Sequence, residues 1–256
     1  MNIRRTLARL KRRLLAKPFY KDKRFQGYWF DQTLKDKAAF VVQIGSNDGK
    51  TGDPLYPLLQ KYPQWRGLFV EPLPNSFAKL KANYPDANRF QLENVAINEG
   101  QRMTFYWVDP KAKEALPDLP YWYDQLGSFD KNHILKQLDG VLEPFIRTTE
   151  LEGINLATLL SRNDVKDISI LHIDAEGYDW KILSQLDLTL YQPLFILYEY
   201  HHLSEEALES SFAFLEEQYE LFDVGIDVLA VYKKIGAERL QEMRQHMKKA
   251  VLPAKH

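Results

Sequence analysis

A glycine loop after a short apolar run is the first place in this chain where residue types and spacing suggest chemistry. Residues 40–49 have the sequence FVVQIGSNDG, an apolar and partly β-branched run followed by small and polar residues. Such a run is typical of a buried parallel strand. Gly45 and Gly49 let the backbone turn sharply and approach a ligand where a Cβ atom would collide. The loop therefore predicts a ligand site at the carboxyl end of the first strand, with an ordinary tight turn as the alternative.

An acidic residue closes the next apolar run and narrows the choice of ligand. Glu71 follows Leu68-Phe69-Val70, and a carboxylate about 20 residues or more after a glycine loop can accept both hydroxyls of a nucleoside ribose. The spacing G-x-x-x-G differs from the dinucleotide spacing G-x-G-x-x-G, which brings a pyrophosphate onto a helix N-terminus. Asp48 in the loop would repel a pyrophosphate and would suit the ammonium of a methionine moiety. These residues favour S-adenosylmethionine over NAD or ATP.

Strand and helix signals alternate along the rest of the chain and predict the sheet that positions these residues. We expect strands at 40–44, 68–71, 90–95, 103–108, 168–173, 194–198, 220–224 and 228–233, the last two antiparallel. We expect helices at 28–37, 75–84, 151–160, 178–186 and 204–219, and one that begins at Asp53-Pro54. This order indicates βαβ units and a mostly parallel α/β sheet.

Polar clusters follow several of these strands. Asn94 and Ala96 come after the third strand and would lie beside adenine, while DAEG (174–177) and EYHH (199–202) follow two later strands. In an open α/β sheet, ligands bind outside the carboxyl ends of the strands. We therefore expect these clusters to share one site with the glycine loop and Glu71.

Carboxylates and histidines in the last two clusters are candidates for the catalytic step. A hydroxyl acceptor of a methyl group needs in-line placement and must lose a proton. In an extended chain Asp174 and Glu176 would point the same way, as would Glu199 and His201, and two close carboxylates raise one another's pKa toward that of a usable base. Alternatively, Asp174, Glu176 and Glu199 could hold Mg²⁺. In a structural alternative, Asp174 caps the next helix and Glu176 pairs with a basic residue.

Residues 109–150 interrupt the strand and helix alternation. Three prolines surround Tyr121-Trp122-Tyr123, and Gly127-Ser128-Phe129-Asp130-Lys131 follows. A long insertion in a compact domain is typical of a lid or a binding loop, and its aromatic rings would suit sugar faces or flat apolar substrates. The alternative is that the rings close a hydrophobic edge. His133 in this insert could reach a substrate, whereas His202 would point away from His201 in an extended chain.

The net charge of −1 hides basic ends and an acidic body. Residues 1–24 carry ten Lys and Arg against one Asp, and residues 233–256 carry seven against two Asp and Glu, which leaves −15 for the middle. Such a body would repel nucleic acid, so we expect no nucleic-acid partner. The 256 residues contain no cysteine, which excludes disulfides and thiolate sites, and no apolar run of a membrane-spanning length. A cytoplasmic protein is expected.

The basic N-terminus has three interpretations. Ile3, Leu7, Leu10 and Leu14 recur at helical spacing among arginines. The segment could be a helix packed on the domain, a helix in peripheral contact with an anionic membrane, or a targeting peptide, although the serines and cleavage site of such a peptide are missing. A second basic helix is expected at 237–250.

Several segments together resemble the FkbM family of S-adenosylmethionine-dependent methyltransferases. They are VVQIGSNDG, FVEP, ENVAIN, SFDKNHILK and, most specifically, LHIDAEGYDWKIL, and the resemblance covers residues 40–232. It implies a Rossmann-like class I methyltransferase with a seven-stranded, mostly parallel sheet and helices on both faces. It also implies a domain over 38–234 that includes the insert, flanked by extensions at 1–37 and 235–256. The family usually methylates a hydroxyl of a sugar, glycolipid or secondary metabolite.

The resemblance also implies roles for individual residues. The methionine end of the cofactor would be lined by Gly45, Asn47, Asp48 and Gly49, the ribose would bind Glu71, and adenine would lie beside Asn94 and Ala96. Further cofactor-binding candidates are Gln43, Ser46 and Asp174. Gln43 and His172 depart from the family, which often has aspartate and lysine there. Two other functions compete with methyl transfer. One is an NAD-dependent oxidoreductase, and the other is a non-catalytic, membrane-attached binding module of the same fold.

Overall fold

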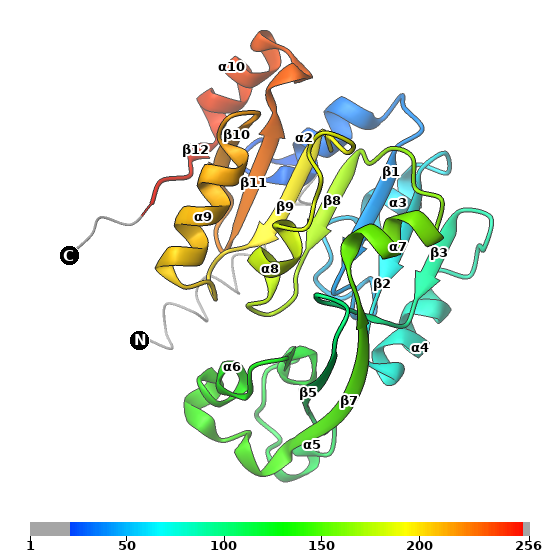
Figure 1. The fold of residues 1–256 in the computed structure, drawn as a ribbon, viewed down its shortest axis with the longest axis vertical. Helices are drawn as coiled ribbons and strands as arrows, with labels where there is room; N and C mark the ends of the chain where they lie inside the picture. The colour runs from blue at the N-terminus through cyan, green and yellow to red at the C-terminus, as the bar shows by residue number, and fades with distance from the viewer. Residues whose placement is uncertain (1–20, 253–256) are drawn as a thin grey trace.

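The first predicted strand is β1 (Phe40–Ile44), which lies inside an eight-stranded sheet in the computed structural model, whose described part covers residues 21–252 (Figure 1). β2 (Arg66–Val70) pairs in parallel with one side of β1 and β8 (Ile170–Ile173) with the other. β3 (Phe90–Glu93) and β9 (Phe195–Glu199) extend this parallel part. β1, β8 and β9 are buried along almost their whole length, as parallel strands covered on both faces require.

One side of the sheet is antiparallel. β11 (Asp227–Tyr232) pairs with β9, β10 (Tyr219–Asp223) with β11, and β12 (Lys248–Lys249) with β10. Within the described chain the strand order is β12-β10-β11-β9-β8-β1-β2-β3. The predicted α/β fold and the closing antiparallel pair are confirmed. The sheet is mixed rather than uniformly parallel, and the short β12 is an additional strand that covers the edge of β10.

Successive residues of the strands face two hydrophobic cores, one on each side of the sheet. Val41 and Phe69 belong to one core, and Val42 and Leu68 to the other. The helices of the first core are α2 (Gln26–Leu34), α3 (Tyr56–Lys61), α4 (Pro74–Asn83) and α10 (Ala237–His246). Those of the second are α7 (Leu156–Arg162), α8 (Asp179–Leu183) and α9 (Glu205–Leu215). Helices therefore cover both faces, as predicted.

Two predicted helices end earlier than expected because their last residues join strands. α9 ends at Leu215, and Tyr219, predicted as its last residue, begins β10 and packs its ring against Tyr232. α10 ends at His246, and Lys248–Lys249 form β12 instead of a further turn of helix. In both places pairing with a distant strand overrides the local helical spacing.

A second sheet carries the insert. β5 (Arg102–Val108) pairs antiparallel with β7 (Ile146–Ile154) from Arg102 opposite Glu152 to Val108 opposite Ile146. The short strands β4 (Ala96–Ile97) and β6 (Gly127–Ser128) complete this sheet in the order β4-β7-β5-β6. The strand predicted at 103–108 is confirmed. The helix predicted at 151–160 is wrong over residues 151–154, which belong to β7.

The insert projects from one end of the main sheet and has its own small core (Figure 1). That core includes Val108, Tyr123, Ile134 and Leu142. Its short helical elements are α5 (Ala112–Ala115), η2 (Tyr123–Gln125), α6 (Lys131–Leu135), η3 (Gln137–Gly140) and η4 (Glu143–Phe145), while η5 (Lys233–Ile235) precedes α10. Side chains of the insert pack together, so it is a small folded unit rather than an extended loop.

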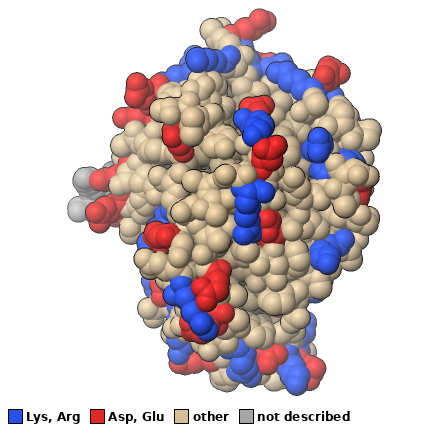
Figure 2. Space-filling view, turned by 45° about the vertical axis from the view of Figure 1, so that its right-hand side comes forward, with Lys and Arg blue, Asp and Glu red and all other residues tan. Residues whose placement is uncertain are grey.

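Several predictions concern the chain ends and the surface. The predicted basic helix with Ile3, Leu7, Leu10 and Leu14 lies outside the described residues. Within 21–252, every helix is too short or too polar to cross a membrane. On the face shown in Figure 2, Lys and Arg alternate with Asp and Glu, so that face carries no basic patch of the kind that binds nucleic acid.

Candidate active site

Loops at the carboxyl ends of β1, β2, β8 and β9 surround a cleft of about 1750 Å³. Most of the predicted site residues line this cleft, as the strand order requires. They are Gln43, Gly45, Ser46, Asn47, Glu71, Ala96, Asp174, Glu176, Glu199 and His201, and His172 lines it as well. The second sheet and the insert contribute Phe105, Trp122 and Phe129. The volume is sufficient for a nucleoside cofactor together with an acceptor.

Gly45 is required by close packing between two loops of the cleft. Its φ is +78°, and a Cβ atom placed on it would lie 1.8 Å from the carbonyl oxygen of Asp174. The loop after β1 therefore rests directly on the turn after β8. This contact places the predicted cofactor loop beside the predicted catalytic carboxylates.

Gly45→Ala is expected to lower the free energy of unfolding by at least about 2 kcal/mol more than Gly52→Ala, an effect of the size typical of overpacking. Gly52 has the same positive φ of +78°, but a Cβ atom added to it would meet no heavy atom within 4 Å, so its substitution carries only the backbone cost. Chemical denaturation of both variants measures the difference. Equal destabilisation would show that the two loops do not depend on this contact.

Glu71 lies at the end of β2 and holds the glycine loop. Its Oε2 accepts a hydrogen bond from the Asn47 amide at 2.9 Å, and its Oε1 accepts one from the Leu73 amide at 2.8 Å. Burial raises the pKa of Glu71 to about 7. A carboxylate has about four acceptor positions, so two remain for ligand hydroxyls. Its position in the cleft fits the predicted ribose role.

Cofactor affinity is expected to rise about tenfold per pH unit from pH 5 to 7 and then level off. Ligand hydroxyls donate to the ionised form of Glu71, so below its pKa of about 7 binding must displace a proton. For the free protein the sign is opposite, because a raised folded-state pKa removes stability as pH rises through 7. Titration calorimetry across this range measures the slope. If the affinity of Glu71→Gln rose with pH by the same slope, the pH dependence would belong to another group.

Three predicted cofactor residues, Asp48, Gly49 and Asn94, do not line the cleft. The Asp48 carboxylate accepts hydrogen bonds from the amides of Lys50 and Thr51 and from the Thr51 hydroxyl. Burial opposes ionisation, but these bonds bring the pKa of Asp48 below its ordinary value. Gly49 packs against Tyr84, whose ring carbon would lie 2.5 Å from an added Cβ. Asn94 donates to the carbonyl groups of Glu71 and Pro72. All three stabilise loops.

Asp53, rather than Asp48, is the loop aspartate that lines the cleft. Its Oδ1 accepts from the amides of Leu55 and Tyr56. The helix α3 begins later than predicted, at Tyr56, with Leu55 rather than Asp53 as its N-cap residue. Gln43 Nε2 donates to Asp53 Oδ2 at 2.7 Å, and burial raises the pKa of Asp53 to about 6. Gln43 Oε1 is buried and has no hydrogen-bond partner among the described residues. This acceptor beside a carboxylate suits an ammonium group.

Asp179 shapes the DAEG turn and was not recognised from the sequence. Its side chain is buried and accepts hydrogen bonds from the amides of Ala175, Gly177 and Glu199. Burial raises the pKa of Asp179 to about 8. It therefore joins the turn after β8 to the end of β9. The available signal was a second aspartate at the first position of a helix, shortly after IDAEG.

The backbone is not extended between Asp174 and Glu176, contrary to the expectation from two-residue periodicity. Glu176 has a φ of +51°, in the left-handed region. Ser128 Oγ of the insert donates to the Glu176 carbonyl oxygen at 3.0 Å and supports this conformation. Both carboxylates nevertheless line the cleft. Among the described residues, the group whose ligand atoms converge closely enough for one metal ion is His133, Glu176 and His202, which differs from the Mg²⁺ set predicted at Asp174, Glu176 and Glu199.

Glu199 is a buried carboxyl group among several other acids. Burial raises the pKa of Glu199 well above its usual range, and the charges of Glu176, Asp174, Asp179 and Asp227 raise it further. Its Oε2 is buried and makes no hydrogen bond within the described part of the chain. Glu199 is therefore protonated more readily than an exposed glutamate.

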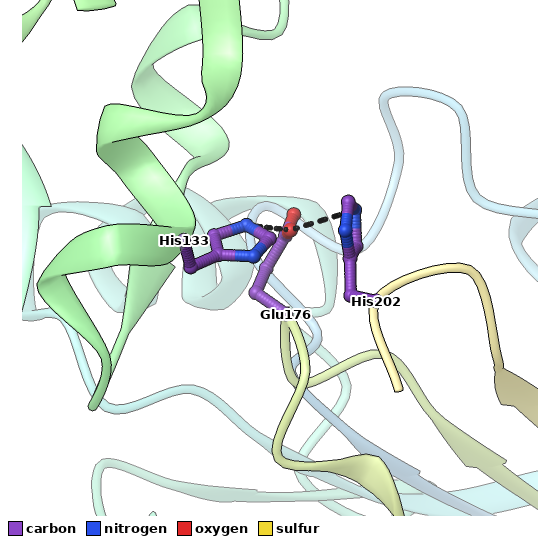
Figure 3. Close-up of side chains that lie close together, drawn as sticks. All are labelled: His133, Glu176 and His202. Atoms are coloured by element: carbon purple, nitrogen blue, oxygen red, sulfur yellow. Dashed lines mark ion pairs between the residues drawn. The ribbon is translucent and has the colours of Figure 1, made fainter. Parts of the chain in front are cut away.

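His202, rather than His201, lies beside the acidic residues, because the chain turns after Glu199. Its Nε2 is 3.6 Å from Glu199 Oε1 and 3.9 Å from Glu176 Oε2. His133 Nε2 of the insert lies 2.7 Å from the same Glu176 oxygen (Figure 3). Burial lowers the pKa of His202 to about 4, so its ring is neutral at pH 7. No sequence spacing joins residues 133, 176 and 202.

The family match extends over most of this architecture. The family described as Methyltransferase FkbM domain matches residues 43–250, from the end of β1 to the last strand of the sheet. The chain belongs to the FkbM methyltransferase family. The resemblance noted in the sequence is confirmed. The protein is a methyltransferase that uses S-adenosylmethionine as its methyl donor. A comparison with curated proteins gives no significant match.

Comparison with solved structures finds matches of low similarity. An O-methyltransferase from Bacillus cereus in complex with SAH is 12% identical, with a TM-score of 0.43, and the match covers 81% of this chain and 80% of that one. A precorrin-6y C5,15-methyltransferase from Geobacter metallireducens is 11% identical, with a TM-score of 0.37 and coverages of 75% and 78%. The fibrillarin/Nop5p complex is 11% identical, with a TM-score of 0.39 and coverages of 76% and 73%.

The charge of this FkbM cleft is opposite in sign to that of the methyl donor. Among the described residues, ten Asp and Glu line the cleft, against three Lys and Arg. An acidic cleft concentrates cations and repels the phosphates of NAD or ATP. S-adenosylmethionine carries a sulfonium, and Gln43 Oε1 with Asp53 offers acceptors for its ammonium group. The residues present therefore fit this cofactor.

Proposed function

We propose that this protein transfers a methyl group from S-adenosylmethionine to a hydroxyl of a sugar, glycolipid or other small-molecule acceptor. The observation that carries the hydroxyl assignment is the group of acids at the ends of β8 and β9. Asp174, Glu176 and Glu199 line the same cleft as the cofactor loop. A hydroxyl acceptor must lose its proton during transfer, and a positioned carboxylate is suited to accept it.

The chain contributes binding, orientation and a proton acceptor. Gln43, Asp53 and Glu71 would hold the two ends of the donor, whose sulfonium would supply the methyl group and leave as the neutral thioether of S-adenosylhomocysteine. Asp174 takes the proton of the acceptor hydroxyl, since its backbone is fixed against Gly45 and it lies beside the loop that holds the donor. Glu199, whose pKa is raised by burial, lines the same cleft and could donate a hydrogen bond to the acceptor when protonated. In-line placement of the acceptor provides the rest of the acceleration.

The insert supports a glycan or flat apolar acceptor. Phe105, Trp122 and Phe129 line the cleft together with the glycine loop, and Tyr121 is exposed beside them. The rings of Trp and Tyr combine apolar contact with a polar group that can hydrogen-bond to an acceptor. The expectations of no nucleic-acid partner and of membrane contact through residues 1–24 stay predictions.

The test is product analysis after incubation with S-adenosylmethionine carrying a deuterated methyl group. The acceptor panel should contain monosaccharides, glycolipids and phenols, with thiols and amines as controls. The proposal expects a labelled ether and an equal amount of S-adenosylhomocysteine. Labelled thioethers or methylamines without ethers would contradict the hydroxyl assignment. Thermal protection by NAD but not by S-adenosylhomocysteine would instead favour an oxidoreductase.

A further inference from the structure

A histidine of the insert meets a carboxylate and a second histidine from the sheet (Figure 3). His133 lies on α6, Glu176 in the turn after β8, and His202 in the turn after β9. One ligating atom from each lies within 4.8 Å of the others. Figure 3 shows both imidazole rings beside the carboxylate, with their ion-pair contacts drawn to it. Two nitrogens and one oxygen from three separate segments thus converge on one small volume.

The contact between His133 and Glu176 is close but is not a hydrogen bond. His133 Nε2 lies 2.7 Å from Glu176 Oε2, yet this nitrogen has no hydrogen-bond partner among the described residues. The two groups are thus in ion-pair contact without a directed hydrogen bond. The His133 side chain is only 7% exposed, and a buried polar atom without a partner is unfavourable. A group bound between the nitrogen and the oxygen would satisfy both.

We propose that His133, Glu176 and His202 bind a divalent first-row transition-metal ion such as Zn²⁺. Two imidazoles with one carboxylate are a common ligand set for such ions, whereas Mg²⁺ prefers oxygen ligands alone. Bonds of about 2.0–2.1 Å at tetrahedral or octahedral angles hold ligand atoms roughly 3–3.5 Å apart. The contacts at 2.7 and 3.9 Å lie on either side of that range, so small side-chain shifts would complete the site.

The ion would join the insert to the main sheet. Ser128 of the insert already bonds to the Glu176 carbonyl oxygen, and the ion would add a second link at the same residue. Three protein ligands leave a coordination position open. Glu176 and His202 line the cleft, so this position would be accessible to the oxygen of an acceptor hydroxyl. That last role rests on the proposed function, whereas the metal site does not.

Metal binding is tested on the full chain after removal of bound ions with EDTA and dialysis. Calorimetry with ZnCl₂, in the absence of cofactor, is expected to show one ion per chain. His133→Gln, Glu176→Gln and His202→Gln should each weaken Zn²⁺ binding by at least about a hundredfold, since losing even a hydrogen-bond partner of a ligand costs about 10- to 100-fold. His201→Gln is the matched control, because it removes the neighbouring histidine outside the set. It should bind Zn²⁺ like the unsubstituted chain.

Limited proteolysis provides a readout that does not depend on activity. Zn²⁺ should slow cleavage within the insert in the unsubstituted chain and in His201→Gln, but not in His133→Gln. Unchanged affinity for S-adenosylhomocysteine in His133→Gln would show that this variant is folded. Absence of Zn²⁺ binding at millimolar concentration, or equal binding by the three ligand variants and the control, would overturn the site.

The two proposals fail in different ways. Zn²⁺ binding without binding of S-adenosylhomocysteine would remove the methyltransferase function and leave the metal site. Cofactor binding and methyl transfer at an unchanged rate in EDTA, together with confirmed Zn²⁺ binding, would remove the acceptor role of the ion and keep its link to the insert.

Discussion

Asp174→Asn is expected to lower the turnover of methyl transfer by about 10²- to 10⁴-fold, the range that general acid–base catalysis supplies. The amide keeps the shape of the side chain but cannot take the proton of the acceptor hydroxyl. The turn should stay intact, because Asp179 accepts its amide hydrogens and Gly45 packs against the backbone of residue 174. Initial rates under saturating cofactor measure the effect.

Asp167→Asn is the matched control for this prediction. Asp167 is exposed and lies at the amino end of β8, whereas Asp174 follows its carboxyl end. The control should keep full turnover, and Asp174→Asn should keep cofactor affinity within a few-fold. If Asp174→Asn also retained turnover within a few-fold, the proton would pass to another group and the catalytic assignment would be wrong.

Glu71→Ala is expected to weaken cofactor affinity by about 2 kcal/mol, close to 30-fold, because hydrogen bonds to a charged group contribute about 1.5–3 kcal/mol. Part of the loss reflects the amide of Asn47, which would lose its acceptor. Glu71→Gln keeps an acceptor without the charge, so its cofactor affinity should lie between those of Glu71→Ala and the unsubstituted chain. Calorimetry with S-adenosylhomocysteine at pH 8 measures all three proteins.

Glu93→Gln provides the comparison on the neighbouring strand. Glu93 is the last residue of β3, in a position like that of Glu71 after β2. The Glu93 carboxylate pairs with Arg162, and Glu93 does not line the cleft. Its substitution should leave cofactor affinity unchanged. Equal affinity in Glu71→Ala and the unsubstituted chain would exclude Glu71 from the ribose site.

The order of strands and the position of the cleft were predictable because they depend on local signals. The β-branched run of β1 and the polar residues that follow each strand are visible in the sequence, and parallel topology forces their carboxyl ends together. Gly45 and Glu71 were found in this way. The two sides of the sheet follow from alternation, which places Val41 and Val42 in different cores.

The errors arose where distant contacts decide local structure. Leu151 and Glu152 favour a helix, but pairing with β5 and β4 holds residues 151–154 in β7. Sequence distance does not show that the Asp48 carboxylate accepts from the amides of Lys50 and Thr51 while Asp53 lines the cleft. Two-residue periodicity holds only within a strand, and β9 ends at Glu199, so it does not place His201 and His202. His133 joins the site through the fold of the insert, for which no sequence period exists.

The central claim is that the loop after β1 and the acid after β2 bind S-adenosylmethionine. Titration of S-adenosylhomocysteine into the full chain at pH 8 tests this claim most directly. We expect one site per chain, with weaker binding in Gly45→Ala and Glu71→Ala and unchanged binding in Glu93→Gln. No heat of binding at millimolar ligand, or an affinity that none of these substitutions changes, would contradict it.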